Sequence, residues 1–321
     1  MTIQQKEIMA SIGDAPEEVS SKVTTNKVIR NFVELFKNLL NGTQEDIEVT
    51  RMVGGASINN AFRNFSSFKA IKPEDGLTDE VVINALRNSH GTRVPMFISE
   101  HCFIQLSIRQ IKRLKEPSVA FVDTIKNILL EIVDYCTSKI VEQEKNRFPR
   151  LYKRINKVAC DIVNERLQPT KEFVEKIVNM QLNYINIRHP EFVLLQKPIP
   201  EKKEVIKEEP IYSTPTPFAA DEAELEDCKT LQKLVIQYYE IVCNSLQYSM
   251  LPKAIMMELV NHVKNNIHEE LEEKIASLGD VVKELTKESE AITQKREQTL
   301  TKLEELERAK TLLQTISEVN M

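Results

Sequence analysis

Glycines are the residues of this chain whose spacing could build a nucleotide-binding loop. A phosphate-binding loop has the form GxxxxGK[ST], because glycine lets backbone N–H groups approach the phosphate oxygens and lysine neutralises their charge. No glycine of the chain has that spacing; they are Gly13, Gly42, Gly54, Gly55, Gly76, Gly91 and Gly279. The sequence therefore predicts no cofactor for these residues, and no binding or hydrolysis of GTP by them alone.

Other side chains that could do chemistry are arranged unfavourably for it. His262 and His268 are six residues apart, which on a helix is out of the i, i+4 register that lets two histidines share a metal ion. Adjacent carboxylates, such as Glu272 with Glu273 or Glu304 with Glu305, point apart on a helix. We interpret the histidines as surface or core residues and the glutamates as a solvated face, and predict neither a catalytic residue nor a metal site.

The cysteines and the chain's hydropathy indicate the compartment. The cysteines are odd in number and contain no CxxC pair; they are Cys102, Cys136, Cys160, Cys228 and Cys243. This pattern is typical of reduced, cytosolic thiols. The first residues lack the apolar core of a signal peptide, and no run approaches the roughly 18 uncharged residues of a membrane span. We expect a cytoplasmic protein that is recruited to an organelle or vesicle membrane only peripherally.

Composition favours helices and excludes one class of partner. The chain has 41% hydrophobic residues, only 7 glycines and no tryptophan. Sheets with tight hairpins require more glycine, because their turns contain residues with positive φ. An all-α fold is predicted. The formal net charge is -5, and basic residues alternate with acidic ones along the chain, so we expect no nucleic acid partner.

Helical periodicity divides the chain into long amphipathic segments. It predicts a helix that stops at Asn41 and Gly42, a short one over 58–66, and one from the N-cap Thr78 to Gly91. A long helix over 99–136 should kink or break briefly at Pro117, and helices over 149–167 and 173–188 should flank Pro169. A proline-rich linker follows, and helices resume at 221 with a disturbance at Pro252.

The C-terminal segment carries a lopsided heptad pattern. One apolar column contains Leu278, Leu285, Ile292, Leu306 and Leu313, while the second column is interrupted by Ser289 and Arg296. This pattern favours a helix packed on a small bundle over an extended homodimeric coiled coil.

Several segments resemble the stalk of the dynamin superfamily. The middle domain of that family is similar to VGGASINNAF (53–62), HGTR (90–93), QIKRLKEP (110–117) and LNYINIRHPEF (182–192). The family's GTPase effector domain is similar to LVIQYYEIV (234–242) and LPKAIMMELVNH (251–262). The resemblance implies a middle domain over 1–193, a flexible linker over 194–220 in place of a membrane- or target-binding insert, and effector-domain helices over 221–321.

The resemblance also implies an architecture and a set of assembly residues. It implies an elongated, antiparallel four-helix-bundle stalk with kinked long helices and a C-terminal bundle-signalling-type helix. Such a stalk dimerises crosswise and forms higher oligomers through loops at one end. Gly91, Thr92 and Arg93 match one of those loops, and Gly54 with Gly55 match the glycine pair of another, where Ser57 replaces the usual arginine. The alternative is that these glycines only turn the chain.

Two further surfaces are expected to bind partners. In the family the linker position holds a lipid- or target-binding element, but Lys197, Lys202, Lys203 and Lys207 are offset here by neighbouring glutamates. The C-terminal helix of the family packs with helices that flank the GTPase domain. No GTPase domain is recognised in these residues, so a face containing Leu303, Leu306, Leu313 and Ile316 should seek a partner.

The sequence leaves three functions open. The first is a non-catalytic self-assembly stalk that scaffolds or regulates membrane remodelling and organelle fission, with itself and a full-length dynamin-related GTPase as partners. The second is a fragment of a complete GTPase whose motor domain, and therefore GTP, lies upstream. The third is an unrelated helical adaptor with a coiled-coil tail.

Overall fold

The described part of the chain is all-α in a computed structural model. The structure describes residues 21–45, 49–65, 68, 70–91, 98–139, 147–193 and 221–319, and these residues contain helices and turns with no strand. The chain divides into two compact units, one built from 1–58, 126–166 and 261–321 and the other from 59–125 and 167–260. Each unit is described by itself. The all-α prediction is confirmed.

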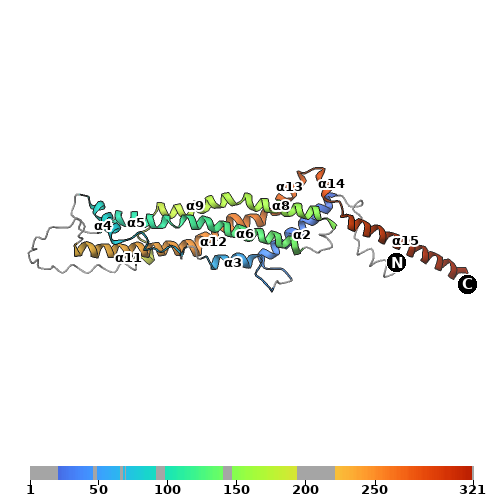
Figure 1. Cartoon of the computed structure of the whole chain (residues 1–321), viewed down its shortest axis with the longest axis horizontal. Coiled ribbons are helices and arrows are strands. Elements are labelled where there is room, and N and C mark those ends of the chain that lie inside the picture. The colour runs from blue at the N-terminus through green and yellow to red at the C-terminus, as the bar shows by residue number, and fades with distance from the viewer. Residues whose placement is uncertain are drawn as a thin grey trace, which may run out of the picture. The chain divides into compact units, whose positions relative to one another are not determined.

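The first unit is a bundle of helices drawn from three distant parts of the sequence (Figure 1). It contains α2 (Ser21–Asn41), the first residues of α3 (Gly55–Arg63), the C-terminal half of α6 (Lys115–Lys139), α8 (Pro149–Glu165), α13 (His262–Ala276), α14 (Val281–Leu285) and α15 (Glu290–Val319). α13 packs against α8 and α2, and α14 packs against α2. The core includes Ile29, Phe32, Phe36, Leu151, Ile155, Val263 and Ile267.

The second unit is built around α11. It contains α4 (Asp79–His90), α5 (Glu100–Lys112), α9 (Leu167–Asn183), α10 (Pro190–Val193), α11 (Glu222–Ser245), the π-helical segments η1 (Leu246–Met250) and η2 (Met256–Asn261), and α12 (Leu251–Ile255). α11 packs against α4 and α5, and α9 packs against α5 and α12. The rings of Phe103, Phe192 and Tyr238 meet with centroids 5.3 to 5.8 Å apart and join α5, α10 and α11.

Local capping signals place several helix ends where the sequence predicts them. Thr78 caps α4 and its hydroxyl accepts a hydrogen bond from the backbone N–H of Val81 at 3.4 Å. Gly91 follows α4 with φ of 60°, and Gly42 follows α2 with φ of 70°. Asp221 starts α11, where its side chain and that of Glu224 form a reciprocal capping box.

The helix breaks lie ahead of the prolines, which corrects the predicted kink positions. α5 ends at Lys112 and α6 begins at Lys115, so Pro117 is in the first turn of the second helix. Pro169 is likewise in the first turn of α9. Proline is tolerated there because the N–H that it lacks would have no intrahelical partner. α12 directly follows the π-helical η1, and Pro252 is the second residue of α12.

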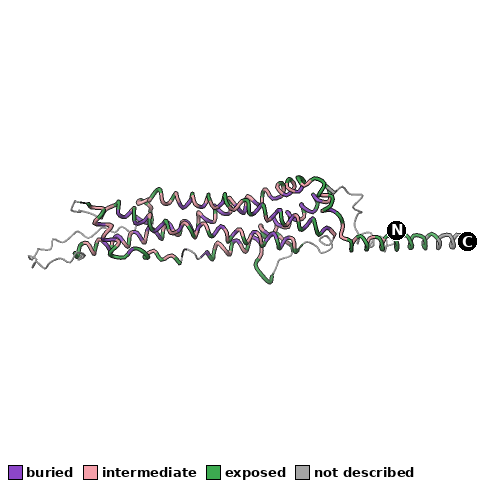
Figure 2. Tube along the Cα trace, turned by 45° about the horizontal axis from the view of Figure 1, so that its top comes forward, coloured by how far each residue is buried: buried purple, intermediate pink, exposed green. Residues whose placement is uncertain are grey.

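The C-terminal heptad column does not lie on one helix. Gly279, with φ of 54°, turns the chain after α13, and Thr286–Ser289 separate α14 from α15. Leu278, Leu285 and Ile292 therefore belong to three different segments. Figure 2 shows that α15 is largely exposed where its burial is described, whereas buried residues follow the facing sides of the other helices.

Candidate functional site

The glycine pair of the predicted assembly loop forms a tight corner between α2 and α3. Gly54 has φ of 65°, and a Cβ atom added to it would collide with the backbone carbonyl of Leu39. A Cβ on Gly55 would collide in the same way with the carbonyl of Leu40. The two glycines thus let the start of α3 lie directly on the last turn of α2. This close approach is reason enough for both glycines, and their role in assembly stays a prediction.

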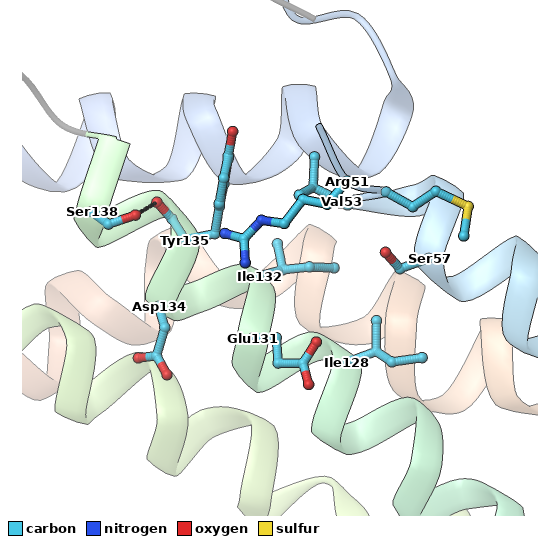
Figure 3. A pocket seen from close by; sticks show the side chains of 11 residues that line it. Arg51, Val53, Ser57, Ile128, Glu131, Ile132, Asp134, Tyr135 and Ser138 are labelled. Carbon is cyan, nitrogen blue, oxygen red and sulfur yellow. Dashed lines mark hydrogen bonds between the residues drawn. The ribbon is translucent and has the colours of Figure 1, made fainter. Parts of the chain in front are cut away.

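Beside this corner is an open hollow of about 330 Å³. Arg51, Gly54 and Ser57 border it from the corner, and Glu131, Asp134 and Tyr135 border it from α6 (Figure 3). The guanidinium carbon of Arg51 is 5.3 Å from the centre of the Tyr135 ring, within the range of a cation–π contact. The hollow therefore contains the cation of Arg51, but its guanidinium is directed to Tyr135, whereas Ser57 borders the hollow on the opposite side (Figure 3).

Sequence reasoning missed Arg51, and no periodic signal could have identified it. It precedes α3 in an irregular stretch, and its partner Tyr135 is 84 positions further along the chain by the residue numbers. Only the fold brings them together. Asp134 is already engaged, because its Oδ1 accepts a hydrogen bond from Nδ2 of Asn156 at 2.9 Å.

The second predicted assembly loop is only partly described. Gly91 caps α4 and has open space around it, while Thr92 and Arg93 lie outside the described residues. The end of α4 is fixed by Arg87, whose Nε and Nη2 donate to the carboxylate of Glu224 at 3.0 and 2.8 Å. The hydrogen bond from Arg87 lowers the pKa of the Glu224 carboxyl. The linker lysines Lys197, Lys202, Lys203 and Lys207 also lie outside the described residues.

The start of α15 is held by a buried carboxylate between two arginines. The Glu288 side chain is 4% exposed and accepts hydrogen bonds from Arg147 at 2.5 Å and from Arg296 at 2.7 and 3.1 Å. The backbone N–H of Ser289 also donates to the carbonyl of Arg147 at 3.1 Å. Burial acts to raise the pKa of Glu288, but the hydrogen bonds and charges of both arginines outweigh it and lower the pKa.

Beyond this clamp, α15 presents apolar side chains to solvent. Leu300 and Leu306 are 44% and 42% exposed, and Leu303 is half-buried. Of the predicted partner face, the side chains of Leu313 and Ile316 lie outside the description. The described part of the face is thus accessible, as a partner-binding surface requires.

The second unit carries exposed apolar side chains that the sequence did not single out. They are Met180 and Tyr184 at the end of α9, Tyr248 in η1 and Met257 in η2, with exposed fractions from 52% to 71%. The end of α9 meets this π-helical region, because Nε2 of Gln181 is 3.3 Å from the sulfur of Met250. A methionine or tyrosine at helical spacing is typical of a core, which is why the pattern alone could not reveal this surface.

The described residues hold no group of histidine, cysteine, aspartate and glutamate side chains placed to bind a metal ion. None of the described helices is both long and apolar enough to cross a membrane.

Two family descriptions match the chain in succession. Residues 2–199 match the dynamin central region, and residues 223–316 match the dynamin GTPase effector domain. In the part of the chain that the structure describes, both regions consist mainly of helices. These matches define a dynamin stalk, and the chain belongs to the dynamin family.

Individual relatives give the same result. The chain is 27% identical over 386 aligned positions to the Dynamin-1-like protein of Danio rerio, and the alignment covers 100% of this chain and 55% of that protein. It is 37% identical over 172 positions to the Dynamin-related protein DNM1 of Saccharomyces cerevisiae, covering 52% of this chain and 21% of the relative. The chain thus spans about half the length of the zebrafish relative.

Proposed function

We propose that these residues form a non-catalytic, self-assembling stalk of a dynamin-related protein that scaffolds or regulates membrane remodelling such as organelle fission. The family membership supports this role, and the observation that carries it is the set of exposed apolar side chains in the second unit. GTP hydrolysis would belong to a GTPase domain supplied elsewhere. Membrane contact would be peripheral, after recruitment from the cytoplasm.

The exposed apolar surface favours association in water. Met180, Tyr184, Tyr248 and Met257 are each more than half exposed. Full burial of one such side chain contributes about 1.5 to 3 kcal/mol, and monomers rarely leave large apolar patches in solvent. A second copy that covers this surface would form the twofold dimer that is the commonest closed assembly.

Replacing Met180 and Tyr184 by aspartate should therefore convert a salt-resistant dimer into monomers. The two changes remove apolar area and place negative charge where the partner would exclude water, so we expect the dimer to weaken by about 100-fold or more. Sedimentation equilibrium at high ionic strength measures this directly.

The control places aspartate at two exposed polar sites of the same unit, Lys229 and Lys233 on α11, and adds more negative charge than the double variant does. This control should keep the dimer. A wild-type chain that stays monomeric at high concentration, or a double variant that dimerises as well as the control, would show that this surface does not mediate assembly. The wild-type chain should also release no phosphate from GTP.

The described part of α15 supports a second contact. We propose that a partner buries the apolar side chains of Leu300, Leu303 and Leu306. This partner is another copy, a full-length relative or a segment upstream of these residues. Changing Leu300 and Leu306 to aspartate should weaken binding to a full-length relative about tenfold or more, because both side chains would leave an apolar interface. Pull-down titrations measure the loss, with Thr301 and Glu305 changed to alanine as the control. Equal binding by both variants would contradict the proposal.

The length of the relatives favours a second candidate, in which this stalk is part of a complete mechanochemical GTPase. The matched regions cover little more than half of the zebrafish relative. Transcript sequence upstream of Met1 tests this candidate: an open reading frame that encodes a GTPase domain would support it, and an in-frame stop codon directly upstream would contradict it.

A further inference from the structure

The first turns of α8 carry positive charges where helix electrostatics disfavour them. No acidic residue occurs from Arg147 to Cys160, whereas Arg150, Lys153, Arg154 and Lys157 follow within the first nine residues of the helix. The helix dipole is positive at this end, so a cation in the first turn destabilises the helix. Like charges three or four residues apart on a helix repel one another. By contrast, α4, α5 and α11 begin with acidic residues.

The described part of the chain offsets this cost only weakly, through the interaction of Arg150 with Glu284. Arg150, Lys153 and Lys157 are exposed, and their spacing places them on one face over a length of about 10 Å. We call these three residues the α8 stripe. None of them has an ion pair with a described residue. The half-buried Arg154 beside them has a buried Nε with no hydrogen-bond partner among the described residues.

Two carboxylates near the stripe, those of Glu284 and Glu288, are bound by other groups. Glu284 is paired with Lys287 at 2.5 Å, and that hydrogen bond is the main reason its pKa is lowered, with a smaller effect from Arg150. Glu288 is held by Arg147 and Arg296. Toward the middle of the helix the stripe ends at the exposed Asp161. A narrow basic strip with acidic groups at both ends suits a narrow acidic helix better than a broad anionic surface.

The chain itself provides a helix of this kind. α11 begins with the sequence DEAELED (221–227), in which Glu222 and Glu226 are exposed and four residues apart. Glu224 is paired with Arg87, but neither Glu222 nor Glu226 has an ion pair with a described residue. These two side chains therefore remain available to bind cations of another molecule.

We propose that the α8 stripe of one copy docks on the acidic first turns of α11 in a second copy. The inference rests on the proposed self-assembly and adds a second, electrostatic contact to it. The two surfaces differ, so the contact is heterologous: each copy keeps a free stripe and a free acidic helix end, and assembly continues into rings or open chains. Exposed ion pairs are weak singly and are screened by salt, so this step should be reversible by ionic strength.

The test follows assembly beyond the dimer by sedimentation velocity at about 50 mM and about 500 mM salt, where the Debye length shortens from about 14 to about 4 Å. Wild-type oligomers larger than the dimer should form only at low salt. The variant Lys153→Glu with Lys157→Glu should weaken that step about tenfold or more. The control Lys27→Glu with Arg30→Glu makes the same change in net charge at exposed sites on α2 and should assemble normally.

Charge reversal on the other side identifies the occupant. Glu222→Lys with Glu226→Lys should also weaken the step, and combining it with the α8 double variant should restore it. Loss without restoration would overturn the choice of α11. Unchanged assembly of the α8 variant would overturn the docking role of the stripe. A variant that assembles normally but loses co-sedimentation with phosphatidylserine vesicles would also overturn it, because the stripe would then bind an anionic membrane. The salt-resistant dimer tests the proposed function separately, because it involves no residue of the stripe or of DEAELED.

Discussion

Replacing Glu288 by alanine should destabilise the first unit by about 3 to 5 kcal/mol, the cost of breaking a buried ion pair by removing one partner. The Glu288 carboxylate is 4% exposed and binds two arginines whose side chains are only 23% and 12% exposed. Without it, Arg147 and Arg296 would lose the buried carboxylate that both of them bind. We also expect α15 to lose its fixed start, because the clamp joins the segment before α15 to the start of α8.

The same carboxylate should make stability depend on pH on the acid side. Its pKa is lowered in the folded chain from an ordinary value of 4.5, so folding favours the ionised form. The contribution is therefore fully present above the ordinary value and is lost as pH falls through the lowered folded pKa. Urea titrations between about pH 3 and 6 measure the free energy of unfolding of wild type and of the Glu288→Gln variant. The two free energies should become equal at the acid end of this range.

The matched control is Glu284→Ala. Glu284 is also paired, with Lys287 at 2.5 Å, but both side chains are more than half exposed. An exposed pair contributes about 0 to 1 kcal/mol, so this variant should unfold nearly as wild type does. If Glu284→Ala and Glu288→Ala lost similar stability, burial of the clamp would not be the source of its strength.

Local chemistry explains how much of the fold the sequence could predict. Thr78, Gly91 and Asp221 act on neighbouring backbone groups, so their effect on helix ends is visible in the sequence itself. The helix breaks near Pro117 and Pro169 were predicted a few residues late. A proline is incompatible with a helical turn before it but fits the first turn of a new helix, so the break falls ahead of the proline. The segment that separates α14 from α15 contains Glu288, whose partner Arg147 is 141 positions away, so this contact could not be read from local sequence.

The candidate surfaces were less predictable, for the same physical reason. Leu306 could be predicted as exposed because it lies on an apolar heptad face for which the sequence shows no packing partner. Its side chain is 42% exposed in the structure. Met180 and Tyr184 have the same periodicity as core residues, and only tertiary packing decides which face of α9 is covered. Arg51 could not be linked to Tyr135 without the fold.

Gly54→Ala should destabilise the first unit by about 3 kcal/mol or more, for two reasons that add. Gly54 has φ of 65°, which costs a residue with a Cβ about 1 to 2 kcal/mol. The added Cβ would also overlap the carbonyl of Leu39, which belongs to the helix backbone and cannot rotate away. Relief requires α3 to move off the last turn of α2, which would expose the side of Ile58 that is now buried.

Two other glycines separate these contributions. Gly42 has φ of 70° with nothing within 4 Å of an added Cβ, so Gly42→Ala should cost only the backbone term, about 1 to 2 kcal/mol. Gly55→Ala keeps a negative φ and adds only the collision with Leu40, so its cost should be intermediate. Thermal unfolding should rank the variants with Gly54→Ala lowest, at about 2 to 4 °C per kcal/mol. If Gly54→Ala instead kept wild-type stability and lost only its higher oligomers, the pair would serve assembly and not the corner between α2 and α3.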